Sequence, residues 1–260
     1  MKKTFIIIII LFITVAFTKA QDTMYYYKSG QIVYSRITSE IDSVIFNQQN
    51  SNINNCGTVT DVDGNTYNTV VIGAQCWLKE NLNTSRYADG TAIPNVTDNI
   101  TFGTLTTGAY RDYNNTPSNS ITYGKLYNWY AAANLHNICP TGWHLPSNGE
   151  WNIMEKYLDN TVDTTFVGQV GVDIGSKLKE SGTSHWTSQN NGTNSSGFSA
   201  LPGGYSAYTF YDIGDYCGFW TSTNYDEISA RDRSLRSSWA TVFNGASFKY
   251  GGLSIRCVKD

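Results

Sequence analysis

Charged residues are scarce in this 260-residue chain, and their scarcity excludes several classes of protein. Asp, Glu, Lys and Arg make up 15% of the sequence, against roughly a quarter in an average globular protein. A nucleic-acid-binding protein needs a concentrated basic face, whereas this chain has a net charge of −3. Proline occurs only 5 times, and the 14% of aromatic residues is too much for a disordered chain. Asn, Ser and Thr together number 78, which favours β-structure with many polar loops over a helical bundle.

Long apolar runs are also rare, and only the N-terminus carries one. Two lysines precede an apolar stretch over residues 5–17, and Thr18 and Ala20 supply the small residues of a cleavage site. Such a stretch rises roughly 20 Å as a helix, which is short of the ~30 Å hydrocarbon core of a membrane. We therefore predict a signal peptide over residues 1–20, cleaved after Ala20, with no membrane-spanning segment after it. The mature chain is expected to be secreted, periplasmic or at the cell surface.

The cysteines are odd in number, and none shows the C-x-x-C spacing of a zinc site. They are Cys56, Cys76, Cys139, Cys217 and Cys257. Disulfides persist outside the cytoplasm, so at most two bridges form and one thiol is left over. The sequence alone does not fix the pairing.

Catalytic and metal-binding motifs are missing as well. The chain has no G-x-S-x-G elbow, no H-E-x-x-H motif and no glycine-rich phosphate loop. His144 lies between Trp and Leu, and we interpret it as a hydrogen-bonded core residue rather than a base. Asp61, Asp63 and Asn65 suggest calcium ligands, but the twelve-residue loop ending in Glu is missing, so we predict a plain turn. We expect no metal and no cofactor; paired carboxylates for glycoside hydrolysis stay open, because their separation depends on the fold.

Residues 21–55 are predicted to form a small β element followed by a linker. We expect strands over 24–28, 31–36 and 41–46, and the polar linker over 48–55. Ser29-Gly30 is a hairpin turn signal between the first two of these strands.

The remainder of the chain carries strand signals around a few helices. Asp63-Gly64, inside the alternating stretch 59–67, predicts a hairpin. A buried helix is expected over 126–135, and a short one over 174–180. Later strands are expected over 198–205, 217–223, 238–243 and 253–258. Strands, then helices, then strands indicate an α+β fold.

The best-marked helix is predicted over 147–158. Ser147 and Glu150 form a capping box at its start. Its buried face is expected to hold the apolar residues at helical spacing, which are Trp151, Met154, Tyr157 and Leu158.

A series of motifs then follows in order along most of the chain. They include Ile72-Gly-Ala-Gln-Cys-Trp77, Tyr123-Gly-Lys-Leu-Tyr-Asn-Trp-Tyr130, Cys139-Pro-Thr-Gly-Trp-His-Leu-Pro146, Leu201-Pro-Gly-Gly-Tyr205, Trp220-Thr-Ser-Thr223 and Ser254-Ile-Arg-Cys-Val-Lys-Asp260. Together they resemble the Fibrobacter succinogenes major paralogous domain, a family of exported bacterial proteins, over residues 56–260. That family is similar to C-type lectin-like folds and to the formylglycine-generating sulfatase-modifying proteins. Residues 24–46 resemble a short hairpin element of other exported bacterial proteins.

This resemblance implies a C-type lectin-like α+β domain with an added N-terminal β-hairpin region. In such a domain the first strand would be 143–145, and the closing strand, 253–258, would return beside it. The resemblance also implies two bridges, Cys139–Cys257 where the ends of this core meet and Cys56–Cys76 across the hairpin. Cys217 is then left over. Family members often have a Cys near the position of Arg111, and its absence here leaves Cys217 without an obvious partner.

Two activities of lectin-like proteins lack their motifs here. Calcium-dependent sugar lectins need a Glu-Pro-Asn or Gln-Pro-Asp triplet, and neither occurs. Formylglycine-generating enzymes need two closely spaced cysteines late in the chain, but only Cys257 follows Cys217.

A binding surface over residues 224–250 remains, where polar, aromatic and Arg residues interleave. We predict that the ligand-contacting residues are Tyr225, Arg231, Arg236, Trp239 and Phe248, because such side chains supply contact area at modest entropic cost. We expect a secreted or cell-surface, non-enzymatic recognition or adhesion module that binds a glycan or a protein. In some lectin-like proteins the equivalent region is rewritten by diversity-generating retroelements, so a diversified binding protein is one version of this hypothesis. The alternatives are a plain strand pair with a solvated face, and an exported hydrolase or formylglycine-generating-like enzyme with an unrecognised site.

Overall fold

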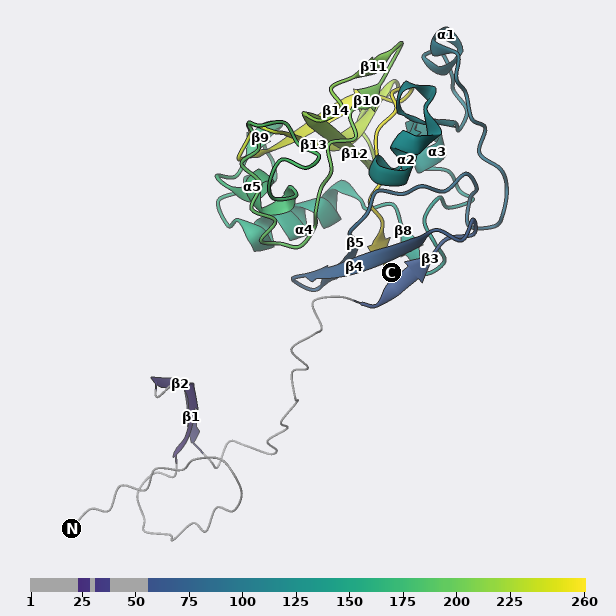
Figure 1. Cartoon of the computed structure of the whole chain (residues 1–260). Helices are drawn as coiled ribbons and strands as arrows, with labels where there is room; N and C mark the ends of the chain where they lie inside the picture. Colours follow the sequence, from purple (N-terminus) through teal and green to yellow (C-terminus); the bar gives the residue numbers. More distant parts are fainter. Residues whose placement is uncertain (1–22, 29–30, 38–55) are drawn as a thin grey trace, which may run out of the picture. The chain divides into compact units, whose positions relative to one another are not determined.

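The structure is a computed structural model that describes residues 23–28, 31–37 and 56–260 (Figure 1). The chain divides into two compact units, residues 1–50 and 51–260. The predicted signal peptide, the third strand over 41–46 and the linker over 48–55 lie outside the described residues. Within the described ranges, no helix is long and apolar enough to cross a membrane.

The described part of the first unit is a two-stranded hairpin. Strand β1 (Thr23–Lys28) pairs antiparallel with β2 (Gln31–Ile37), with Lys28 opposite Gln31 at the turn. The pairing has an irregularity between Tyr26 and Tyr27. The predicted antiparallel pairing of these two strands is therefore confirmed, while the turn residues Ser29 and Gly30 lie outside the described residues.

The second unit is mostly β-sheet with a few short helices, which is consistent with the predicted α+β class. Its described strands are β3 (Thr58–Thr60), β4 (Thr66–Ile72), β5 (Gln75–Leu78), β6 (Tyr110–Arg111), β7 (Leu126–Tyr127), β8 (Trp143–His144), β9 (Gly168–Val170), β10 (Tyr205–Ser206), β11 (Phe210–Tyr211), β12 (Tyr216–Asn224), β13 (Ser229–Arg236), β14 (Val242–Phe248) and β15 (Val258–Lys259). Its described helices are α1 (Asn99–Phe102), the 3-10 turn η2 (Tyr113–Asn115), α2 (Pro117–Tyr123), α3 (Trp129–Ala132), α4 (Asn148–Leu158) and α5 (Ile174–Leu178).

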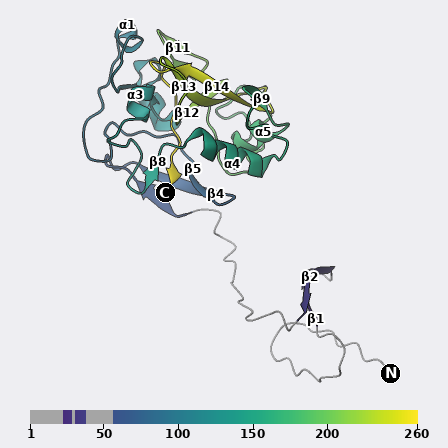
Figure 2. The ribbon, with the colours of Figure 1, turned by 180° about the vertical axis from the view of Figure 1, so that it is seen from behind.

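Two antiparallel sheets form the frame of this unit. One has the strand order β3-β4-β5-β15-β8, and the other has the order β12-β13-β14-β9. The predicted hairpin around Asp63-Gly64 joins β3 to β4, and the last strand lies between β5 and β8 because Val258 pairs with both Trp77 and His144. Figures 1 and 2 both show the first sheet at the lower end of the unit and the second at the upper end, with α4 between them.

Helix α4 begins with the predicted capping box. The Ser147 hydroxyl accepts from the Glu150 amide at 3.2 Å, and the Glu150 carboxylate accepts from the Ser147 amide at 2.8 Å. Trp151 and Met154 are buried as predicted, but Tyr157 is 67% exposed, so its predicted burial is wrong. Glu155 faces inward instead, because it forms a buried ion pair with an arginine of β13.

Several other sequence predictions also need correction. The helix expected over 126–135 is only α3, because Leu126 and Tyr127 pair with β6 and the Asn128 side chain then caps the helix. Of the four later strands, only 217–223 is a strand throughout, as part of β12. Strand β13 was not among the individually predicted strands, since its sequence SARDRSLR lacks apolar alternation. Its pairing with β14 matches the strand pair that was the alternative interpretation of 224–250.

Large aromatic side chains fill the interior between the two sheets. Trp77, Trp151, Phe198 and Phe219 are all buried, and the Trp151 ring lies 5.0 Å from Trp77 and 5.7 Å from Phe219 between centroids. Each buried ring of this size contributes roughly 2–3 kcal/mol by removal from water. This core fixes both sheets in place.

Two disulfides connect distant parts of the frame. They are Cys56–Cys76 and Cys139–Cys257, the two pairings that the family resemblance implied. The second joins residues 118 apart, a loop worth on the order of 4–5 kcal/mol in the chain-entropy model. Cys217 is buried with no disulfide, and burial raises the pKa of its thiol to about 12, so it is protonated and unreactive at neutral pH.

Candidate functional site

The structure places the five predicted ligand-contacting residues at two opposite ends of β13. Tyr225 and Arg231 lie at the end where β12 turns into β13, and Phe248 joins them because it pairs with Ser229. Arg236 and Trp239 lie at the other end. Eight residues of strand extend roughly 25 Å, so the five residues do not form one surface.

The loop between β12 and β13 is held by hydrogen bonds within the chain. The Asp226 carboxylate accepts from the amides of Ile228 and Ser229 at 2.9 and 2.7 Å. The Ser229 carbonyl in turn accepts from the amides of Tyr225 and Asp226, each at 3.1 Å. The loop is therefore a hydrogen-bonded turn in which the Asp226 side chain binds the backbone two and three residues ahead, as Asp commonly does in turns.

A buried lysine supports this loop from the following segment. The Lys249 side chain is 7% exposed, and its Nζ donates to the carbonyls of Asp226 and Glu227 at 2.8 and 2.9 Å. Its charge also lies 4.9 Å from the centre of the Trp129 ring, a cation–π contact. Because two carbonyls and a ring stabilise the ammonium group, Lys249 fixes the loop without a carboxylate partner.

Tyr225 and Arg231 form a pair on this loop. The Arg231 guanidinium lies 4.4 Å from the centre of the Tyr225 ring, and the ring is 51% exposed. Arg231 is only half-buried, yet its Nη1 is covered and makes no hydrogen bond. Tyr225 thus covers the arginine and presents its own outer face to solvent.

Large apolar side chains gather around this end of the sheet. Phe248 stacks on Tyr250 with centroids 5.3 Å apart and planes 9° apart, and Tyr250 lies 5.6 Å from Tyr208 of the β10–β11 turn. Tyr208, Ile228 and Phe248 are 52%, 61% and 50% exposed. We define the tip patch as Tyr208, Tyr225, Ile228, Phe248 and Tyr250. Monomeric soluble proteins rarely expose contiguous apolar patches larger than a few hundred Å², so a cluster of half-exposed rings and apolar side chains makes this end a candidate binding surface.

Three residues of the tip patch were missed by the sequence analysis. Ile228 and Tyr250 lie within the predicted 224–250 surface but were not selected. Tyr208 comes from a hairpin distant in sequence, and it packs so closely on the end of α1 that a Cβ on Gly103 would lie 2.6 Å from its ring. No local pattern indicates that α1, the β10–β11 turn and β14 meet.

The other end of β13 uses the same residue types for internal contacts. Arg236 forms ion pairs with Asp212 and Asp215 at 2.8 and 2.7 Å, and its guanidinium lies over the rings of Tyr216 and Trp239. We call these five residues the Arg236 cluster. Its charge is already neutralised by two carboxylates, which gives Arg236 a structural role whether or not a ligand also contacts it.

The backbone of this end is held by a second buried lysine. Lys179 is fully buried, and its Nζ donates to the carbonyls of Arg236, Ser237 and Trp239 at 2.7, 2.7 and 2.8 Å. Burial lowers the pKa of Lys179 to about 8. Each end of β13 is thus fastened by a lysine bound to main-chain carbonyls.

Between the two ends, Arg233 connects β13 to α4. It is fully buried and donates to Glu155 at 2.7 Å and to the side-chain oxygens of three Asn residues. These are Asn148, Asn152 and Asn244, at 2.9, 2.7 and 2.7 Å. The network satisfies the buried charge, which a fold can tolerate only when the charge is paired and hydrogen-bonded.

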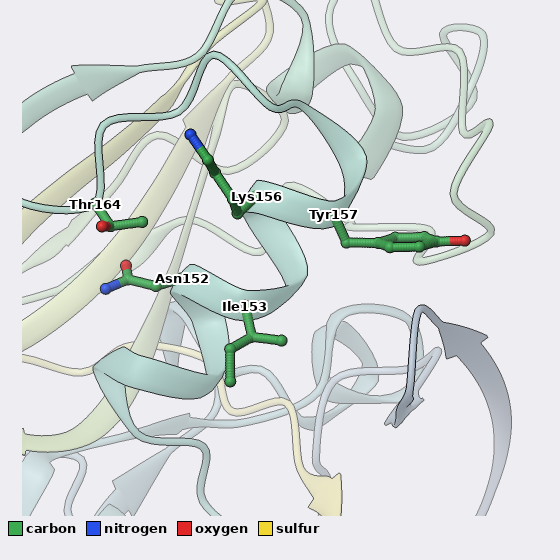
Figure 3. A pocket seen from close by; sticks show the side chains of 5 residues that line it. All are labelled: Asn152, Ile153, Lys156, Tyr157 and Thr164. Carbon is green, nitrogen blue, oxygen red and sulfur yellow. The ribbon is translucent and has the colours of Figure 1, made fainter.

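A separate hollow lies on the outer side of α4, away from the predicted residues. It has a volume of about 500 Å³ and is lined by Asn152, Ile153, Lys156, Tyr157 and Thr164 (Figure 3). Figure 3 shows Asn152, Lys156 and Thr164 on one side and Tyr157 pointing the other way. The Asn152 side-chain oxygen already accepts from Arg233, and Lys156 already donates to two main-chain carbonyls. A small-molecule site needs polar groups that are available to the ligand, so this hollow is the weaker candidate.

Titratable groups form pairs rather than a metal site. In the described part of the chain, no group of three or more His, Cys, Asp or Glu could hold a metal ion. His144 contacts Glu150 and Asp260 at 2.7 and 2.6 Å, but through opposite ring nitrogens, so the carboxylates do not meet. His144 is hydrogen-bonded as predicted, but it is half-exposed and not a core residue.

The acidic turn near residue 63 has the plain structural role that we predicted. Asp61 accepts from the amides of Asp63 and Asn65, each at 2.9 Å, and from the Tyr67 hydroxyl at 2.7 Å. These bonds occupy its carboxylate, which therefore closes the β3–β4 turn.

Comparison with known proteins gives one family. The model of the Fibrobacter succinogenes major domain matches residues 70–259, from within β4 to β15, which leaves out β3 of the first sheet. The chain belongs to this family. No curated protein and no solved structure matches the chain. The Fibrobacter succinogenes major domain thus includes the Cys139–Cys257 bridge, the tip patch and the Arg236 cluster.

Proposed function

We propose that this chain is an exported, non-enzymatic recognition or adhesion protein that binds a glycan or a protein through the tip patch. The observation that carries the proposal is the exposure, by half or more, of four large apolar side chains at one place, Tyr208, Tyr225, Ile228 and Phe248. The loop beneath them is already ordered by Asp226 and Lys249. A binder that is ordered before contact loses less conformational entropy on binding.

Export is supported by the two disulfides and by the signal-like residues 1–20. Disulfides persist in oxidising compartments and are rare in the cytosol. We also propose that the domain has a C-type lectin-like architecture. This is supported by the pairing of β8 with β15, by the bridge that joins them, and by α4 and α5 between them.

The Arg236 cluster is a second candidate contact, through Trp239 and the outer part of Arg236. We rank it below the tip patch because its charge is already paired. If the 224–250 region is diversified, a reverse transcriptase gene and a near-copy of the 3′ coding region should lie nearby in the genome.

The binding proposal is tested with the mature chain on a glycan array and in a cell-surface pull-down. Tyr225→Ala and Phe248→Ala should abolish binding while the melting temperature stays within a few degrees. Ile121→Ala and Leu135→Ala are matched controls, because these apolar side chains are 82% and 103% exposed outside the tip patch. Equal binding by all four variants would remove the tip patch as the site.

The alternative, an exported enzyme, has one candidate acid in this sheet. Burial raises the pKa of Asp232 to about 7, and its carboxyl hydrogen-bonds the Ser247 side chain. The side chain is 2% exposed, however, so a substrate would reach it only after a rearrangement of the sheet. This burial weighs against a catalytic role.

A further inference from the structure

One edge of β14 is open beside the tip patch. On one side β14 pairs with β13 along 243–248, and on the other it pairs with β9 only at Val242, Phe243 and Asn244. The outer edge of Gly245–Phe248 pairs with no strand in the described part of the chain. The Lys249 amide donates to the Ile228 carbonyl on the β13 side, so the alternation of an antiparallel ladder turns the backbone groups of Ala246 and Phe248 toward the outer edge. At that edge the Phe248 carbonyl accepts from the Gly251 amide at 2.7 Å, which leaves the Ala246 amide and carbonyl and the Phe248 amide for an added strand.

This edge lacks the features by which proteins protect exposed strands. Such edges are usually blocked by Lys, by Pro, by a bulge or by a covering loop. The sequence of β14, VFNGASF, has no charge and no proline. Gly245 is buried, whereas Ala246 and Phe248 are exposed and Ser247 is half-buried, so an incoming chain has access along 246–248.

Apolar side chains flank the open edge at both ends. Phe248 and Tyr250 stack at the tip end. At the other end, Asn244 donates to the Phe166 carbonyl at 2.9 Å, which places the exposed Phe166 and Val167 just beyond the last β9 pair. An added strand would therefore have apolar contacts on either side of its backbone hydrogen bonds.

We propose that an extended polypeptide segment binds here as an additional strand, in line with β9 and antiparallel or parallel to β14. This inference rests on the proposed recognition function and narrows its ligand from a glycan or a protein to a polypeptide. Alternating amide and carbonyl groups on a strand edge match the repeat of another polypeptide chain, whereas a glycan has no such repeat. Glu227 is exposed at the tip and its carboxylate has no partner in the described part of the chain, whereas Asp226 is held by two amides. A basic residue is therefore favoured in the part of the ligand near Phe248.

The test uses a phage library of random linear peptides, selected on the mature chain, and synthetic copies of the best binder. Each backbone amide of the synthetic peptide is methylated in turn, which removes one hydrogen-bond donor without changing a side chain. Methylation at alternate positions should weaken binding by about tenfold, and methylation at the positions between should leave it unchanged. Bound peptide should also slow exchange of the Ala246 and Phe248 amides, which face the open edge. Phe248→Ala should weaken binding, and Ile121→Ala should leave it unchanged.

Three results would overturn the strand-addition proposal. The first is a selected peptide whose affinity shows no alternation with methylation, and the second is a library that yields no binder. The third is a dimer of the chain in sedimentation velocity that dissociates in Phe248→Ala, since a second copy would then be the occupant of the edge. Binding of glycans that is lost in Phe248→Ala, without any peptide binding, would keep the tip patch as a recognition site and reject the polypeptide ligand.

Discussion

The two ends of β13 contain the same residue types in opposite settings. At one end Arg231 lies under Tyr225, and the ring faces solvent. At the other end Arg236 lies against Trp239 but is paired with Asp212 and Asp215. An interleaved Arg and aromatic sequence therefore does not distinguish a binding surface from a structural cluster. The difference lies in whether carboxylates from another segment neutralise the arginine.

The comparison also shows how one strand serves both the frame and the surface. Arg233, midway between the ends, is fully buried in the network with Glu155. Because each end is fastened by a lysine to main-chain carbonyls, the exposed side chains at the tip contribute little to the fold. Substitutions along β13 should therefore separate stability from binding.

The largest expected effect is at the centre of the strand. Arg233→Ala leaves Glu155 buried without a partner, and breaking a buried pair in this way costs about 3–5 kcal/mol. Denaturant unfolding of the mature chain measures the loss, with Arg231→Ala as the control because that residue is half-exposed and unpaired with a carboxylate. Equal losses for the two variants would contradict the division of roles.

The next effect is expected at the support of the tip loop. Lys249→Met keeps an apolar chain against Trp129 but removes two charged hydrogen bonds to the loop carbonyls, at a cost of about 1.5–3 kcal/mol. Amide exchange over 224–229 should accelerate, and ligand binding should weaken even though Lys249 itself is buried. Unchanged exchange in this loop would show that Asp226 alone holds it.

A smaller effect separates the two arginine ends. Arg236→Ala removes two partly exposed ion pairs, so its free energy of unfolding should fall by only about 1 kcal/mol. Tyr225→Ala should change that energy by less than about 0.5 kcal/mol, as surface substitutions usually do, while abolishing binding. A larger loss of stability in Tyr225→Ala than in Arg236→Ala would contradict the assignment of Arg236 to a structural role and of Tyr225 to a binding role.

The last effect is the pH dependence that His144 contributes in the first sheet. Partial burial lowers the pKa of His144, but hydrogen bonds from its ring to the carboxylates of Asp260 and Glu150 outweigh this and raise the pKa above 6.5. This stabilisation is complete below pH 6.5 and is lost as the pH rises through the raised value. The groups are partly exposed, so we expect about 0.5 kcal/mol. Melting temperatures of the wild type and His144→Gln, measured from pH 5.5 to 8.5, should converge at high pH. Ligand binding at the tip patch should be the same in the two proteins at every pH.

Local chemistry decided which elements could be predicted from the sequence. The capping box at Ser147 and the Asp63-Gly64 hairpin depend on contacts between near neighbours, and both are present as predicted. Strand β13 was missed because most of its buried residues are polar or charged, among them Arg233, whose partners lie on α4 and β14. The pattern of apolar residues does not reveal a strand whose inner face is satisfied by polar groups.

The site could be predicted only in part, for a similar reason. The stretch 224–250 does hold the tip loop, and Tyr225 and Phe248 are exposed there. The partners that neutralise Arg236 come from 212–215, and Tyr208 comes from the β10–β11 turn. These contacts join segments that only the folded chain brings together, so the sequence could not separate the two ends of β13.

The first and last described residues of the domain both lie at the sheet that contains β15. Its edge strand β3 begins soon after residue 56, and the chain ends at Asp260, whose amide donates to the Gly142 carbonyl at 3.1 Å. Figures 1 and 2 show both β3 and the C-terminus at the end of the domain opposite α1 and β11. A tether joined to this domain at Cys56 or at Asp260 would therefore leave the end that carries Tyr208 and Phe248 far from the attachment point and open to a ligand.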